Sequence, residues 1–77
     1  MKHFKKHKCF NYRFLITGFT EWRLYSYTPR NNEFEKGLKY RLCESWYCPE
    51  WGEQRTIERY KVASIKEAEN IIKGLQV

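Results

Sequence analysis

Aspartate is absent from the sequence, because all nine acidic residues are glutamate. Calcium and magnesium loops built on aspartate, and Ser-His-Asp triads, are therefore excluded. The four glycines stand singly, so no glycine-rich loop is present to hold a phosphate group. Because one short domain also encloses little volume for a substrate, we predict that the protein is not an enzyme.

Long hydrophobic runs and closely spaced cysteines are also missing. No stretch approaches the roughly 20 apolar residues of a membrane span, and residues 1–10 lack the apolar core of a signal peptide. Cys9, Cys43 and Cys48 are an odd number without a close pair, which favours reduced thiols over a disulfide framework. We therefore expect a cytoplasmic protein that does not interact with membranes.

The histidines and cysteines do not match a metal or nucleophile site. His7 and Cys9 are separated by a single residue, and Cys43 and Cys48 need not lie close together, so the spacing does not support a zinc ribbon. Both histidines precede the predicted domain, in a segment expected to be mobile, which argues against a catalytic cysteine and histidine pair. We predict no metal and no other cofactor.

What the sequence does contain is aromatic side chains and positive charge. Aromatic residues make up 18% of the 77 residues, so we expect one folded domain rather than a disordered chain. The net charge of +6 favours an anionic partner, either nucleic acid or an acidic protein surface. Five basic residues and no acidic residue lie within the first thirteen. We interpret residues 1–8 as a basic N-terminal arm that precedes a single domain at residues 9–77.

Alternation of apolar and polar residues predicts four β-strands. Turn-forming residues separate them: Gly18, the stretch 29–37 and the stretch 48–52. In the fourth strand Ile57 and Tyr60 fall on opposite faces unless a β-bulge shifts the register. The predicted strands span residues 12–17, 21–28, 38–47 and 54–62.

The clearest local signal is the start of a helix. Ser64 is followed three residues later by Glu67, which is the spacing of a capping box. An apolar stripe with helical spacing follows, and Gly74 is placed to end the helix. We therefore predict an α+β fold, in which a four-stranded antiparallel β-meander carries one C-terminal α-helix on one face. The stripe consists of Ile65, Ala68, Ile71, Ile72 and Leu75.

Side-chain alternation assigns the two faces of this sheet. The more apolar set is expected to meet the helix, and it comprises Phe10, Tyr12, Phe14, Ile16, Trp22, Leu24, Leu38, Tyr40 and Leu42. The opposite set comprises Arg13, Leu15, Arg23, Tyr25, Tyr27, Lys39, Arg41 and Cys43, joined by Arg55, Arg59 and Lys61 if the fourth strand keeps its register.

A basic face that contains tyrosines suits single-stranded nucleic acid, because lysine and arginine neutralise phosphates while aromatic rings stack on bases. No signature of an RNA-recognition, KH or cold-shock module is present. The alternative is that these charges only solvate an open face, with Arg23 and Arg41 pairing with neighbouring glutamates. The predicted binding residues are Lys5, Lys6, Lys8, Arg13, Arg23, Tyr25, Tyr27, Lys39, Arg41, Arg59 and Lys61.

Large aromatic residues outside this face suggest a second hypothesis. Trp46, Tyr47 and Trp51 surround a predicted turn, and Phe34 lies in a polar loop, so these side chains are candidate anchors for a protein partner unless they cover the end of the core. In size and style the chain resembles the small proteins with which phages and mobile elements bind and inhibit host machinery. That resemblance implies an inhibitor of a host protein complex. Exposed strand edges also allow a monomer or an edge-paired homodimer.

Overall fold

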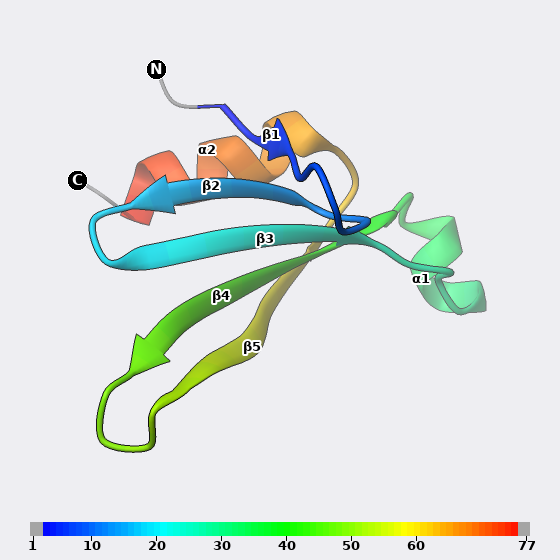
Figure 1. The fold of residues 1–77 in the computed structure, drawn as a ribbon. Coiled ribbons are helices and arrows are strands. Elements are labelled where there is room, and N and C mark those ends of the chain that lie inside the picture. Colours follow the sequence, from blue (N-terminus) through cyan, green and yellow to red (C-terminus); the bar gives the residue numbers. More distant parts are fainter. Residues whose placement is uncertain (1–2, 76–77) are drawn as a thin grey trace.

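The computed structural model of the protein describes residues 3–75. The predicted α+β fold, with an antiparallel sheet and a C-terminal helix, is confirmed, but the sheet has five strands rather than four and has the order β1-β2-β3-β4-β5 (Figure 1). A short helix also lies in the stretch predicted to be a loop. The elements are β1 (Lys5–Lys6), β2 (Arg13–Thr17), β3 (Thr20–Ser26), α1 (Asn31–Glu35), β4 (Tyr40–Cys48), β5 (Glu53–Val62) and α2 (Ile65–Leu75).

The start of α2 has the predicted capping box. The Ser64 hydroxyl oxygen accepts a hydrogen bond from the Glu67 amide at 3.1 Å, and the Glu67 carboxylate accepts one from the Ala63 amide at 2.9 Å. These bonds satisfy amides that the first turn of a helix leaves unpaired. The apolar stripe then buries Ala68 and Ile72 against the sheet.

The turn between β2 and β3 sets the register of the first long hairpin. Gly18 has a φ of 59°, a conformation that glycine adopts without steric cost, and only Gly18 and Phe19 separate the paired residues Thr17 and Thr20. In this register Leu15 lies opposite Trp22 and joins the core, and Arg13 lies opposite Leu24 on the same face as α2.

The predicted face assignment of β2 is therefore wrong. Tyr12, Phe14 and Ile16 point away from α2, because every side chain of a strand changes face when the register differs by one residue. Phe10, also expected to meet the helix, is 64% exposed. The predicted faces of β3 and β4 are correct. The buried core consists of Phe4, Leu15, Trp22, Leu24, Leu42, Val62, Ala68 and Ile72.

Part of the basic segment at residues 1–8 is integrated into the sheet. Lys5 and Lys6 pair with β2, and the neighbouring Phe4 is only 8% exposed within the core. The carboxylate of Glu69 on α2 accepts a hydrogen bond from the Phe4 amide at 2.9 Å. This contact joins the first strand to the last helix.

A register shift in the β4–β5 pairing decides which side chains of β5 share a face. Leu42 pairs with Tyr60 and Cys43 pairs with Glu58, so Arg59 is the extra residue. Lys61, opposite Arg41, stays on the face away from α2. Figure 1 shows that α2 lies behind β2 and β3, whereas the β4–β5 hairpin extends away from the helix toward its turn.

Candidate nucleic-acid interface on the open face of the sheet

The face of the sheet opposite α2 is not covered by any described element, and we call it the open face. Its aromatic and basic side chains come from neighbouring positions in the strand register. Tyr25 lies in β3 and Tyr27 follows the last residue of that strand, so the two rings continue one row with the spacing of about 7 Å of same-face residues in extended chain. The aromatic and basic members of the open face are Lys5, Tyr12, Phe14, Arg23, Tyr25, Tyr27, Lys39, Arg41 and Lys61.

Tyr12 is the centre of an aromatic cluster on this face. Its ring lies 5.1 Å from that of Tyr25 and 4.9 Å from that of His7, measured between centroids. The Phe10 ring is nearly parallel to the Tyr12 ring, at an interplanar angle of 11° and a separation of 6.1 Å. The guanidinium carbon of Arg23 lies 4.8 Å from the Tyr12 centroid, a cation–π geometry. Burial raises the pKa of the Tyr12 phenol, and Arg23 offsets this in part.

The loop that carries Phe10 is held by His7. The Nδ1 atom of His7 accepts hydrogen bonds from the amides of Cys9 and Phe10, at 3.0 and 3.1 Å. The His7 amide donates to the carbonyl of Tyr12 at 3.0 Å. Because Nδ1 accepts twice, the neutral ring carries its hydrogen on Nε2. These contacts hold the ring of Phe10 above the sheet.

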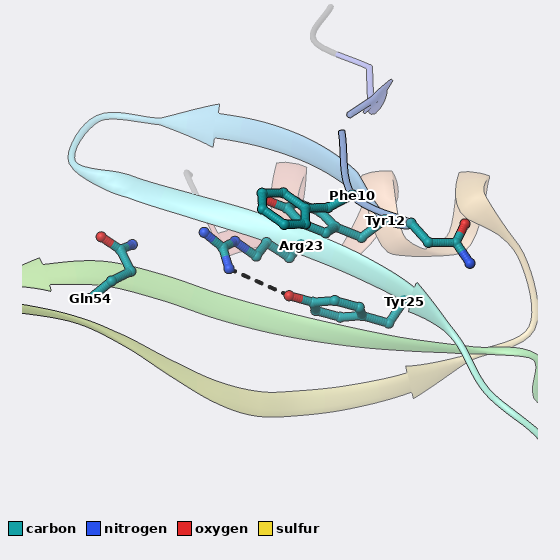
Figure 2. Close-up of a pocket in the computed structure, with 6 residues that line it drawn as sticks. Phe10, Tyr12, Arg23, Tyr25 and Gln54 are labelled. Carbon is teal, nitrogen blue, oxygen red and sulfur yellow. Dashed lines mark hydrogen bonds between the residues drawn. The ribbon is translucent and has the colours of Figure 1, made fainter. Parts of the chain in front are cut away.

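Beside this cluster the open face is hollowed. The hollow has a volume of about 580 Å³ and is lined by Phe10, Asn11, Tyr12, Arg23, Tyr25 and Gln54. Figure 2 shows the Arg23 guanidinium between Tyr25 and Gln54, with Phe10 and Tyr12 above it. Apolar rings with a few polar groups among them are the typical lining of a ligand site.

Three of the basic side chains on the open face are paired with glutamates, and for Arg23 and Arg41 such pairing was the alternative that the sequence offered. Arg23 pairs with Glu21, Arg41 with Glu58 at 3.3 Å, and Lys61 with Glu33 of α1. The hydrogen bond between Lys61 and Glu33 raises the pKa of the lysine and lowers that of the glutamate. These pairs reduce the positive field over the middle of the sheet.

Part of the unpaired positive charge lies at the β1 edge, on Lys5, Lys6, Lys8 and Arg13. Elsewhere among the described residues, Arg30, Lys36, Lys39, Lys66 and Lys73 also make no ion pair. Lys8 belongs to the same loop as Phe10, and Lys5 lies opposite Phe14 on the open face. Two unpaired lysines, Lys5 and Lys8, therefore lie next to the aromatic cluster.

Tyr27 lies at the other end of the open face. Its ring is contacted by two cations, since the Arg41 guanidinium carbon is 5.0 Å and the Lys61 ammonium is 5.6 Å from its centroid. Its hydroxyl is buried and has no hydrogen-bond partner among residues 3–75. Lys39 lies beside it, because the Tyr27 amide bonds the Lys39 carbonyl at 3.3 Å.

Some predicted binding residues do not lie on the open face. Arg13 and Lys6 are opposite one another on the face of α2, beside a smaller hollow of about 200 Å³. Arg59, displaced by the bulge, pairs with Glu44 at 3.0 Å, and Glu44 lies opposite Trp22 on that same face. The structure therefore removes these three residues from the predicted surface.

The aromatic residues predicted to contact a protein partner do not form one patch. Tyr47, 59% exposed, and Trp46 are successive residues of β4 and point to opposite faces. Trp51 is 70% exposed in the β4–β5 turn, with the Arg55 guanidinium carbon 5.7 Å from its ring. Phe34 is exposed on α1, at the opposite end of the sheet from that turn (Figure 1).

Sequence reasoning missed Phe10, Tyr12 and His7 as members of the site. Phe10 and Tyr12 were assigned to the buried face, and His7 was treated as part of a mobile segment. A usable signal was the pair Gly18 and Phe19, because a two-residue turn there places Leu15 opposite Trp22. Asn11 and Gln54 carry no sequence signal that distinguishes them from other polar loop and strand residues.

Two free cysteines belong to this region, with Cys9 exposed in the loop that carries Phe10. Cys43 is buried on the open face, and burial raises the pKa of its thiol. Across the part of the chain that the structure covers, no three histidine, cysteine or glutamate side chains are grouped so as to hold a metal ion.

Comparisons with known proteins provide no further guide to function. No protein-family model matches the chain, and searches of the curated proteins and of the solved structures return no significant match. Within residues 3–75, no helix has the length and apolar character required to cross a membrane.

Proposed function

We propose that this protein is a non-enzymatic binding module for single-stranded nucleic acid, which contacts bases on the open face and phosphates at its β1 edge. The observation that supports this most directly is the position of the aromatic cluster next to the unpaired lysines. Flat rings with adjacent cations are the combination that single strands require.

The bases would stack on the exposed rings. Within the aromatic cluster Phe10 offers an exposed ring, and Tyr25 in β3 and Tyr27 just beyond its end continue the row. Tyr12 supports them, because its own ring is already contacted by Phe10, Arg23 and Tyr25. Each stacked base contributes about 1 to 3 kcal/mol.

The phosphates would contact Lys5 and Lys8 at the β1 edge, with Lys39 at the other end of the open face as a further contact, and none of the three makes an ion pair among the described residues. Arg41 and Lys61 would contribute less, because a phosphate must compete with Glu58 and Glu33 for them. With few phosphates bound, the affinity should fall with salt by a shallow slope, and stacking should maintain binding near physiological salt.

Phe10→Ala tests this proposal, with Phe19→Ala as the matched control. Phe19 is fully exposed in the β2–β3 turn, outside the aromatic cluster, so its removal should leave binding unchanged. We expect Phe10→Ala to weaken the binding of labelled single strands by roughly fivefold to a hundredfold, the loss of one stack. Fluorescence anisotropy at low and physiological salt, with single-stranded RNA, single-stranded DNA and duplex DNA, measures this. Tighter binding to the duplex, or equal losses in both variants, would contradict the proposal.

The exposed turn of the β4–β5 hairpin supports a second candidate, an inhibitor that binds a host protein complex. Trp51 is 70% exposed there, and all residues from Glu53 to Lys61 are exposed, so neither face of this hairpin end is covered. Exposed tryptophan with arginine beside it is typical of interface hot spots. In a pulldown from host lysate, Trp51→Ala should lose a protein partner that Phe10→Ala retains. A partner captured equally by both variants would refute this candidate.

A further inference from the structure

The hollow beside the aromatic cluster differs from the rest of the open face in its polar groups. Arg23, Arg41 and Lys61 each pair with a glutamate, but only Arg23 of the three lines the hollow, where it is held in place from two sides. Its Nε bonds Glu21 and its Nη1 contacts the Tyr25 hydroxyl at 3.5 Å. Burial works against the charge of Arg23, but these contacts raise its pKa above the usual value.

The terminal edge of the Arg23 guanidinium keeps donors for a ligand. Nη2 makes no hydrogen bond to any of the described residues, and Nη1 has a second N–H beside its long contact with Tyr25. Two parallel N–H groups in a fixed fork match two adjacent acceptors on a ligand. Because the side chain is stacked on Tyr12, this fork is already oriented before a ligand arrives.

From this geometry we infer that the hollow seats one guanine of the bound strand, an inference that rests on the proposed function. Guanine presents two adjacent acceptors, O6 and N7, and arginine is their most common partner. Adenine places its N6 amino donor where guanine has O6, and uracil lacks an adjacent acceptor pair, so a donor-only arginine excludes both bases. Cytosine in a single strand does expose two adjacent acceptors, O2 and N3, and is disfavoured instead by its smaller ring.

The remaining lining groups complement the same base. A purine ring covers more of the Phe10 and Tyr25 rings than a pyrimidine does. The amide of Gln54 donates through Nε2 to Ser45 at 2.8 Å, which leaves its Oε1 oxygen to accept from the N–H groups of guanine. Gln54 lies on the opposite side of the Arg23 guanidinium from Tyr25 (Figure 2). The hollow thus combines donors from Arg23 with an acceptor from Gln54.

A set of matched RNA strands tests this inference. Four labelled strands of about nine nucleotides, a length within the site sizes of single-strand binders, would differ only at a central position, with adenine on either side. We expect the strand with central guanine to bind at least fivefold more tightly than the other three, the lower end of what one bidentate base contact provides. Anisotropy titrations at physiological salt measure the four affinities.

Arg23→Lys should remove the preference, because lysine keeps the charge without the fork. The affinities of the four strands should then differ by no more than about twofold, which is less than one ordinary hydrogen bond contributes. Arg59→Lys, which alters an arginine paired with Glu44 on the other face, is the matched control and should retain the preference.

The outcomes separate the inference from the proposed function. Equal affinities of the wild-type protein for all four strands, preference for another central base, or a guanine preference that survives Arg23→Lys would each overturn the guanine site. In all three cases single-strand binding itself would stand. Failure of all four strands to bind would overturn both. The wild-type series is decisive even if Arg23→Lys does not fold.

Discussion

At the scale of single residues, His7 shows how one side chain shapes the candidate site. Its imidazole replaces water as the acceptor for two loop amides, and its ring packs against Phe10, Tyr12 and Phe14. The shape of the loop is therefore set by contacts within the protein. Such preorganisation lowers the conformational entropy that binding would otherwise cost.

Substitution of His7 should separate its role as an acceptor from its role in packing. His7→Leu keeps an apolar side chain but removes the acceptor, so we expect a loss of about 1 kcal/mol, or roughly fivefold in single-strand affinity. His7→Asn should retain more affinity, because an asparagine oxygen accepts from amides two or three residues later in the chain. Anisotropy and urea unfolding of both variants measure this. Equal affinity of the leucine variant and the wild type would show that the loop does not need the acceptor.

At the scale of elements, the two-residue strand β1 is notable because side-chain contacts, more than its own pairing, hold it in place. Phe4 enters the core, and Glu69 of α2 accepts hydrogen bonds from the Phe4 amide and from His3 at 3.2 Å. Charged lysines on so short an edge strand also discourage pairing with a second chain. The unpaired charge at the β1 edge is thus fixed to the sheet by the helix.

The Glu69 contact should make stability depend on pH. Burial favours the protonated form, but the hydrogen bonds from Phe4 and His3 outweigh it and leave the pKa of Glu69 below its ordinary value. A carboxylate with a depressed folded-state pKa stabilises the fold above the unfolded-state pKa of about 4.3, and this contribution is lost as the pH falls through the folded-state value.

We therefore expect the wild type to lose more free energy of unfolding between pH 7 and pH 3 than Glu69→Gln, which keeps an acceptor but does not titrate. Glu50→Gln, in the exposed β4–β5 turn, is the matched control and should follow the wild type. Urea unfolding across this range measures the difference. Parallel pH profiles for the wild type and Glu69→Gln would show that the contact does not stabilise the fold.

At the scale of the whole molecule, the net charge of +6 is a poor guide to where a polyanion would bind. Glutamates compensate the arginines in the middle of the sheet, whereas Lys5, Lys6 and Lys8, at the edge formed by β1 and the loop before β2, have no glutamate partner among the described residues. The aromatic cluster lies beside that edge rather than in the middle of the sheet. A partner that needs both rings and charge would therefore bind at one side of the open face.

The sequence by itself determined the elements that depend on local interactions. The capping box at Ser64, the apolar stripe of α2 and the alternation in β3 and β4 each involve residues close together in the chain, so their pattern is sufficient to place them. The spacing of Ile57 and Tyr60 left open in the sequence whether the last strand has a bulge, and the structure has one between them.

Only the tertiary structure decided the faces of β2 and the composition of the site. Both sets of alternating residues in that strand contain large apolar side chains, so alternation alone does not identify the buried one. The choice depends on non-local contacts: Leu15 packs with Trp22 and with Phe4 of the N-terminal segment. A change of one residue in the register turns every side chain of a strand to the other face. With Leu15 in the core, Tyr12 and Phe14 therefore lie on the open face, next to Arg23 and Tyr25.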